Sequence, residues 1–184
     1  MIQTYAEGGD GVPRGADPAT VDASETFEEF YAREFPTMVA LAYALSGSRT
    51  ASEDLAQEAL LAAHNDWGRV GGFERPDVWV RRVVTNLSMS MFRRRYAEAR
   101  ALARLALGTA TTMPALSADD AEFWAAVRSL PRRQAQVIAL HYLDDRSVAQ
   151  IAEILGTATG TVKKHLHDGR LAVALRLRLE EENA

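Results

Sequence analysis

Residues Ser147–Arg178 read SVAQIAEILGTATGTVKKHLHDGRLAVALRLR, and this stretch predicts two helices that meet at a tight turn. In the first helix, Val148, Ile151 and Leu155 are spaced so that they lie on one face. Gly156 follows, and glycine can adopt the positive φ with which many helices end. The pattern predicts a helix-turn-helix.

The second helix has an apolar side and a basic side. We expect Val162, Leu166 and Leu171 to pack inward. The basic or titratable side chains expected to face outward are Lys163, Lys164, His167 and Arg170. Such a face can meet phosphates and base edges. The alternative is an ordinary pair of packed helices in a bundle, which would leave the basic face unused. Asp168 and Gly169 interrupt the basic helix, and the interior glycine costs about 1 kcal/mol relative to alanine.

Composition limits the class of protein. The 184-residue chain is 47% hydrophobic and 25% charged, which is typical of a globular protein. It has no cysteine, which excludes disulfides, thiol catalysis and cysteine-ligated zinc. The start of the sequence lacks the segments of a signal peptide, and no run is apolar and long enough to cross a bilayer. We therefore expect a cytoplasmic protein without membrane insertion.

Charge is segregated along the chain, although the net charge is only −4. Residues 1–80 carry 5 arginines against 14 acidic residues. Residues 81–104 carry 7 arginines against one glutamate, and residues 160–178 carry 5 basic residues against one aspartate. Two basic stretches that follow an acidic one in the sequence suggest a protein that contacts DNA at two places and offers an acidic face to another partner.

The titratable residues do not suggest catalysis. His165 and His167 are two positions apart on a predicted helix, so they point in different directions and cannot share a metal ion. Asp144 and Asp145 are adjacent carboxylates, but they fall at a predicted turn, where short acidic side chains are common. We expect no enzymatic activity, no cofactor and no metal site.

The N-terminal half reads as an arm followed by helices. Residues 1–24 are rich in glycine, proline and aspartate and predict a disordered arm. Thr26–Glu29 is a capping box that begins a helix, and Pro36 should end it before a second helix. Thr50–Glu53 is another capping box, which should begin a helix that reaches about Trp67.

That last helix carries a polar stripe beside its packed side. The stripe has the spacing of one helical face and consists of Asp54, Gln57, Glu58 and Leu61. On physical grounds alone, an acidic stripe of this kind is more often a solvated face than a binding site.

A long basic helix is predicted to start at Pro76, because proline suits the first turn of a helix. One side is apolar, and the other side ends in the run Arg93–Arg95, which suits a phosphate backbone. A basic helix could instead lie on an anionic membrane. We discount the membrane because the apolar side is needed for the core.

No strand pattern occurs, so the sequence predicts an all-α protein of two small helical domains. The domains should span residues 25–106 and 119–178. The uncharged residues 107–118 should form a flexible linker, and residues 179–184 a tail.

With these stretches in view, the sequence resembles the extracytoplasmic-function class of bacterial RNA polymerase sigma factors, a class of the sigma-70 family. The motifs that carry the resemblance are FYAREFPTMVALAYALSG (30–47), EDLAQEAL (53–60), PDVWVRRVVTNL (76–87) together with the FRRR after it (92–95), and the stretch from LPRRQ to HDGR (130–170). Four such motifs in this order are far more specific than any one of them. The resemblance makes the first domain sigma region 2 and the second domain the helix-turn-helix of sigma region 4.

The resemblance also implies roles for residues. Contacts with core polymerase, at the clamp helices of its beta-prime subunit, fall on Asp54, Gln57, Glu58 and Leu61. Contacts with the melted minus-ten promoter strand fall on Arg81, Arg82, Asn86, Arg93 and Arg94. Contacts with the minus-thirty-five duplex fall on Arg133, Thr161, Lys163, Lys164, His167 and Arg170. The beta flap of polymerase and an anti-sigma factor are further partners that the resemblance implies.

Promoter spacing bears on the linker. Two elements about 16–19 base pairs apart would place the two domain centres about 60 Å apart on DNA, so the linker should run nearly extended there.

The alternative function is a stand-alone helix-turn-helix transcriptional regulator whose first domain dimerises or senses a ligand. A pull-down with core polymerase distinguishes the two functions.

Overall fold

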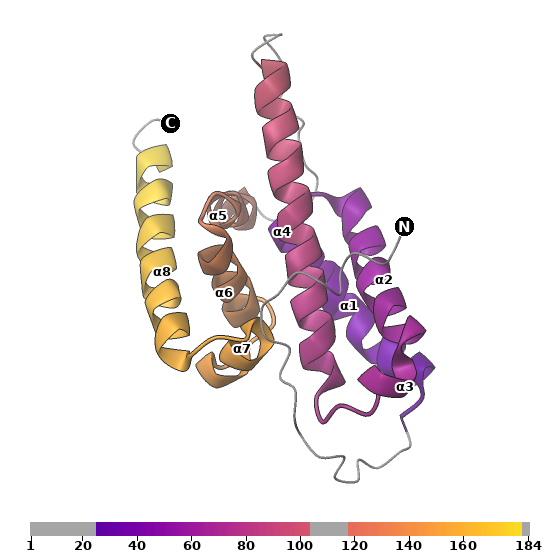
Figure 1. Cartoon of the computed structure of the whole chain (residues 1–184). Coiled ribbons are helices and arrows are strands. Elements are labelled where there is room, and N and C mark those ends of the chain that lie inside the picture. Colours follow the sequence, from indigo (N-terminus) through magenta and orange to yellow (C-terminus); the bar gives the residue numbers. More distant parts are fainter. Residues whose placement is uncertain (1–24, 104–117, 182–184) are drawn as a thin grey trace.

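The computed structural model describes residues 25–103 and 118–181, and within these ranges it contains eight α-helices and no strand (Figure 1). The all-α prediction is confirmed. The N-terminal arm and residues 104–117 of the linker region lie outside the described residues. None of the described helices combines the length and the apolar character needed to span a membrane.

The first half of the chain forms a bundle around one long helix. Its elements are α1 (Phe27–Ser46), α2 (Arg49–Asn65), the short α3 (Trp67–Val70) and α4 (Pro76–Ala103). Helices α1, α2 and α4 pack on one another. Fully buried Phe30, Leu41, Leu60 and Val84 belong to the shared core. The bundle leaves one side of α2 and one side of α4 for other contacts.

Helix α1 begins where the sequence predicts, but it does not end at Pro36. Thr26 caps the helix, and its hydroxyl and the Glu29 side chain bond each other's backbone N–H groups. Pro36 then lies inside one continuous helix that ends at Gly47, which has a φ of 68°. The predicted break is wrong. Buried residues on both sides of the proline, such as Phe30 and Met38, hold the helix in place despite the missing hydrogen bond.

Helix α2 begins earlier than predicted. Its N-cap is Ser48, whose hydroxyl accepts a hydrogen bond from the N–H of Ala51. The predicted capping box at Thr50–Glu53 is therefore wrong. Thr50 lies inside the first turn of α2, and the hydroxyl of the buried Ser52 donates to the carbonyl of Arg49. The two-residue shift of the helix start leaves the polar stripe on the same face of α2.

The second half contains α5 (Ala118–Arg128), α6 (Arg132–Tyr142), α7 (Val148–Leu155) and α8 (Thr159–Glu181). Ser147 and Gln150 form a capping box at the start of α7, and Gly156 ends the helix with a φ of 61°. Helix α8 packs against α5, α6 and α7. The helix-turn-helix is present. Helix α8 extends to Glu181, so the first three residues of the predicted tail are helical.

The packed side of α8 differs from the prediction at one position. Val162 and Leu166 are buried as expected, but Leu171 is 57% exposed. Gly169 takes the inward place, where a Cβ atom would stand 3.1 Å from Cγ1 of Ile138 on α6. The glycine lets α8 approach α6 closely, and this approach turns Leu171 outward.

The two halves pack directly on each other. Helix α4 lies between the α1–α2 pair and the second half (Figure 1), and contacts join α4 to α7 and α1 to α5 and α6. Buried apolar residues from both halves form one continuous cluster. The contact between the halves therefore covers part of α4, the helix that was predicted to bind DNA.

Candidate functional site

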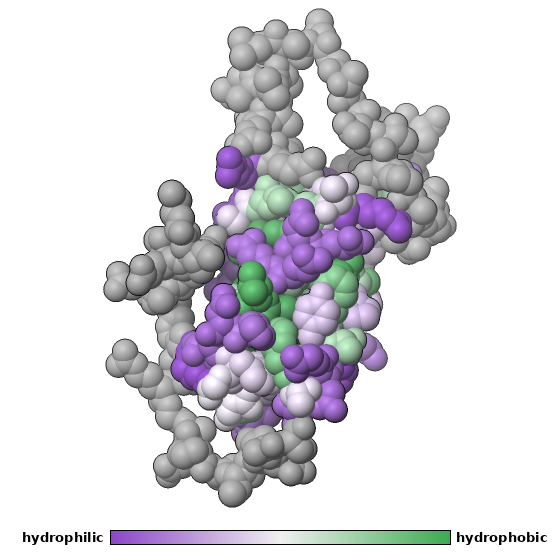
Figure 2. All heavy atoms as spheres, turned by 90° about the vertical axis from the view of Figure 1, so that its right-hand side faces the viewer, coloured by the Kyte–Doolittle hydropathy of each residue, from purple (hydrophilic) through white to green (hydrophobic). Residues whose placement is uncertain are grey.

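The polar stripe of α2 is exposed. Asp54, Gln57, Glu58 and Leu61 all face away from the core, while Leu55, Ala59 and Ala63 on the other side of the helix are buried. Leu61 is 54% exposed. Figure 2, which shows this side of the molecule, has apolar side chains bordered by hydrophilic ones. The stripe thus offers carboxylates, an amide and one apolar side chain to a partner.

The outer face of α8 is also exposed. Thr161, Lys163, Lys164, His167 and Arg170 all point away from the core, as predicted. Lys164 is not free of partners, because its Nζ lies 2.8 Å from Oδ2 of Asp168 one turn later. The hydrogen bond and charge of Lys164 lower the pKa of Asp168.

Helix α6 orients part of this face. The Nε of Arg170 donates to the hydroxyl of Tyr142 at 2.7 Å, and its guanidinium lies 5.4 Å from the centre of the Tyr142 ring. A second nitrogen of Arg170 lies 3.1 Å from Nε2 of His141. Arg133, the remaining residue of the predicted duplex-binding set, is exposed on α6. Residues of two helices therefore contribute to the surface around α8.

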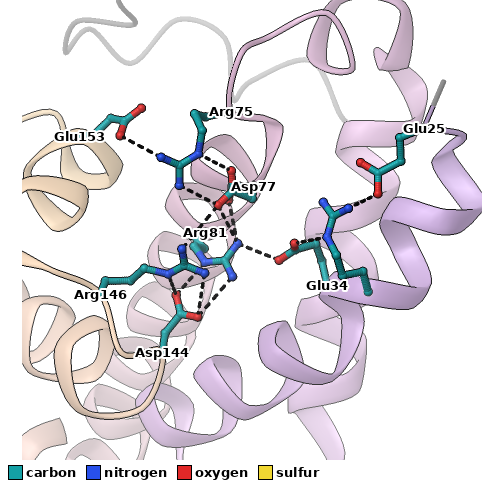
Figure 3. A network of polar contacts seen from close by, with 9 residues as sticks. Glu25, Glu34, Arg75, Asp77, Arg81, Asp144, Arg146 and Glu153 are labelled. Carbon is teal, nitrogen blue, oxygen red and sulfur yellow. Dashed lines mark hydrogen bonds and ion pairs between the residues drawn. The ribbon is translucent and has the colours of Figure 1, made fainter. Parts of the chain in front are cut away.

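Arg81 on α4 is buried instead of facing solvent. Its side chain is only 3% exposed, and Nε and Nη2 donate to the two carboxylate oxygens of Asp144 at 2.6 and 3.2 Å. Its Nη1 donates to Glu34 of α1 at 2.7 Å (Figure 3). Burial lowers the pKa of Arg81, but Asp144 and Glu34 outweigh it, so the pKa is raised above its usual value. Arg81 is a charged residue at the contact between the halves.

Around Arg81, charges from both halves form one network. Arg146 lies 3.0 Å from Asp144 and 3.7 Å from Asp77, which also contacts Arg81 at 3.4 Å. Burial raises the pKa of Asp77, but a hydrogen bond from Arg75 and the nearby arginine charges outweigh it and lower the pKa overall. At the edge of the network, Arg75, the residue before α4, lies 3.6 Å from Glu153 of α7 (Figure 3).

Two more residues of the predicted minus-ten set contact the second half. Arg82 donates to the carbonyl oxygens of Ile154 and Glu153, at 2.6 and 3.0 Å. These carbonyls end α7, where a cation is favourable. The side-chain oxygen of Asn86 accepts hydrogen bonds from Arg132 and from Gln136, the latter at 3.0 Å. In contrast, Arg93 and Arg94 further along α4 are exposed.

Asp144 and Arg146 were missed as functional residues by sequence reasoning. The Asp144 carboxylate contacts Arg81, 63 positions away, and no local pattern signals such a pairing. The turn that holds it was predicted, and Asp145 within that turn has a positive φ of 52°. The structure therefore brings Arg81, Arg82 and Asn86 together with the second half and leaves the α2 stripe and the α8 face on opposite sides of the molecule (Figure 1).

Comparison with known proteins places both halves in one family. Residues 30–98 match the family model "Sigma-70 region 2", and residues 120–173 match "Sigma-70, region 4". The RNA polymerase sigma-E factor of Streptomyces antibioticus is 30% identical over 129 residues, which cover 70% of this chain and 71% of that protein. The ECF RNA polymerase sigma factor SigW of Bacillus subtilis is 28% identical over 152 residues, covering 75% and 81%.

A solved structure supports the same assignment. The chain is similar, with a TM-score of 0.62 and 25% identity, to the sigma factor RpoE in its complex with the anti-sigma factor NepR from Bartonella quintana. The match covers 83% of this chain and 96% of that one. Two region matches in the expected order, with relatives and a fold that agree, show that this chain belongs to the sigma-70 family as an extracytoplasmic-function sigma factor.

Proposed function

We propose that three surfaces carry out the work of this sigma factor: the α2 stripe binds core polymerase, α4 holds the melted minus-ten strand, and the outer face of α8 reads the minus-thirty-five duplex. As a sigma factor, the protein binds core RNA polymerase and directs promoter-specific initiation, and it is not an enzyme. Family membership decides against the stand-alone regulator. The assignment of the three surfaces to individual residues is the proposal.

One observation carries this assignment. The α2 stripe and the basic face of α8 are both exposed, and they lie on opposite sides of the molecule (Figure 1). The two surfaces also share no residue and belong to different halves, so polymerase and DNA do not compete for the same side chains. Leu61 is 54% exposed and leaves apolar surface in water. Contact with a partner would bury this surface, whereas a face that only meets solvent would not.

The face of α8 supports binding to duplex DNA. Lys163, Lys164 and Arg170 supply positive charge, and Thr161 and His167 add polar groups at the same surface. A helix of this width fits the major groove. Arg133 on α6 extends the basic surface to where a phosphate backbone would run.

The role of α4 requires a different arrangement of the halves. Arg93 and Arg94 are exposed in this structure, but Arg81, Arg82 and Asn86 contact the second half. We assign all five residues, the two exposed arginines and the three covered residues, to binding of the melted minus-ten strand. The covered three can act only after the halves have separated.

Reconstitution with core polymerase tests the function as a whole. The full chain is added to core enzyme, the mixture transcribes a library of genomic fragments, and the start sites are mapped. We expect start sites preceded by two shared sequence elements, and no such starts with core alone. Binding of the chain to DNA without any co-purification of core polymerase would instead support the stand-alone regulator.

Two further assignments follow from the same function. A protein that acts with RNA polymerase on the bacterial chromosome works in the cytoplasm, which is where we place it. The solved complex of RpoE with NepR supports an anti-sigma factor as an additional partner of this chain. Affinity purification of the full chain from its native cells tests this partner, and recovery of polymerase subunits alone would argue against it.

A further inference from the structure

Arg170 of the proposed duplex-binding face is bonded to a histidine that belongs to none of the predicted binding sets. His141 lies half-buried in the last turn of α6. Its Nδ1 is 3.0 Å from the carbonyl oxygen of Arg146, and its Nε2 is 3.1 Å from Nη2 of Arg170. The imidazole ring therefore connects the turn before α7 with the exposed face of α8.

The turn between α6 and α7 fixes one partner of this ring. The N–H of Arg146 donates to the carbonyl oxygen of Leu140 at 2.9 Å, and Asp145 has a positive φ of 52°. These two features fold the chain back over the end of α6, which brings the carbonyl of Arg146 to the ring of His141. The guanidinium of Arg146 is paired with Asp144, so the contact with the ring is made by the backbone.

The two partners of His141 determine where its proton lies. A carbonyl oxygen only accepts hydrogen bonds, so Nδ1 must carry a hydrogen that it donates to Arg146. A guanidinium only donates, so Nε2 must be unprotonated and accept from Arg170. Both bonds together require a neutral imidazole with its single proton on Nδ1.

We propose that neutral His141 is a positioning residue for duplex binding, which together with Tyr142 holds the guanidinium of Arg170 in the orientation that contacts DNA. The inference rests on the proposed function of α8. Of the five N–H groups of a guanidinium, Tyr142 takes one and His141 takes one, so three remain for phosphates or base edges. A side chain that is already ordered loses less entropy when DNA binds.

A second proton on His141 would break this arrangement. Nε2 would become a donor that faces a donor of Arg170, and two cations would meet. The other charged or titratable groups beside the ring are Tyr142 and Arg146, which is paired with Asp144. Among the residues that the structure describes, no carboxylate forms an ion pair with the ring that would compensate for the added charge.

The sign of the pH dependence follows from the neutral ring. The contribution of His141 to duplex binding is fully present at the alkaline end of the range in which histidines titrate, about pH 5 to 8. It is lost as the pH falls through that range, because the protonated ring no longer accepts from Arg170.

Two substitutions of His141 separate the roles of its two nitrogens. In His141→Gln, the side-chain oxygen can replace Nε2 and accept from Arg170, but it does not titrate. In His141→Asn, the shorter amide can replace Nδ1 and donate to Arg146, but it leaves no acceptor at the position of Nε2. Both replacements are polar and uncharged, so a merely structural role for His141 would not distinguish between them.

Fluorescence anisotropy with a duplex of mixed sequence would measure the Kd of the full chain and of both variants, at constant low ionic strength. At about pH 8 we expect His141→Gln to bind within about twofold of the parent, and His141→Asn to bind about threefold to tenfold more weakly. Equal affinities of all three proteins would overturn the positioning role. Circular dichroism and urea denaturation check that both variants are folded.

The same titrations at about pH 5.5 test the protonation state. Between the two pH values, the Kd of the parent should rise by about threefold or more relative to the Kd of His141→Gln. The ratio removes the effects of His64, His165 and His167, which titrate in both proteins. A ratio that stays constant, or that falls on acidification, would overturn the proposal, and this comparison decides even if His141→Asn does not fold.

A double-mutant cycle tests whether His141 acts through Arg170. Arg170→Ala should weaken duplex binding, and His141→Asn should then have no further effect. Additive losses would mean that His141 does not act through Arg170. Lys163→Ala separates this inference from the proposed function of α8. If neither Lys163→Ala nor Arg170→Ala weakens duplex binding, the role of α8 fails and the inference fails with it. If both weaken binding while the His141 variants do not, only the positioning role is wrong.

Discussion

Arg170 on α8 donates a hydrogen bond from Nε to the hydroxyl oxygen of Tyr142, the last residue of α6, at 2.7 Å. The same guanidinium lies over the Tyr142 ring, 5.4 Å from its centre. Tyr142 is itself 51% exposed, so it contributes little to the core. Its contact with Arg170 therefore serves to orient a side chain of the proposed duplex-binding face.

Replacing Tyr142 by phenylalanine tests this orienting role. The ring stays, but the hydroxyl that accepts from Arg170 is lost, so we expect duplex affinity to fall by roughly twofold to tenfold. Fluorescence anisotropy with the full chain measures the change. Tyr31→Phe on α1 is the control, because Tyr31 lies in the other half and makes only ring contacts in the described structure. Equal losses in the two variants would mean that Tyr142 has no specific role.

The two lysines of α8 should differ in how much they contribute to salt-dependent binding. Lys164 is paired with Asp168 at 2.8 Å, whereas no ion pair with Lys163 occurs among the described residues. Lys163→Ala should reduce the log–log salt slope of DNA binding by about one unit, and Lys164→Ala by less. Arg49→Ala, an exposed cation on α2, is the control. If both lysine variants keep the parental slope, this face does not contact phosphates.

Binding to core polymerase should depend on the α2 stripe. Gln57 and Glu58 are exposed, so replacing both by alanine should leave the helix signal in circular dichroism unchanged. We expect the double variant to lose co-purification with core polymerase. Glu28→Ala on α1 removes an exposed charge elsewhere and should bind normally. Normal binding by the double variant would mean that the stripe is a solvated face that does not contact polymerase.

We expect that replacing Gly169 by alanine destabilises the protein, although this substitution usually stabilises a helix. Alanine in a helix interior normally improves stability by about 1 kcal/mol relative to glycine. Here the new Cβ would lie 3.1 Å from Cγ1 of Ile138, which is 1% exposed and cannot move aside easily. We therefore expect Gly169→Ala to lower the free energy of unfolding by about 1–2 kcal/mol, measured by urea denaturation. Gly160→Ala, with no atom within 4 Å of its added Cβ, should be neutral or stabilising.

The sequence by itself determined the features that arise from neighbouring residues. Ser147 and Gln150 begin α7, and Gly156 ends it, because caps and positive φ depend on a few adjacent positions. The exposure of the α2 stripe and of the basic residues of α8 followed from helical periodicity. Helical periodicity and Gly156 were enough to predict the helix-turn-helix and the exposure of these side chains.

The tertiary structure decided what depends on distant partners. Pro36 stays inside α1 because the helix is packed on both sides of it, and Leu171 turns outward because Gly169 meets Ile138 of another helix. Arg81 looked like a surface cation of a basic helix, and only its contact with Asp144, 63 positions away, makes it a buried one. Periodicity shows which side of a helix faces a protein interior, but it cannot show which other segment covers the remaining side.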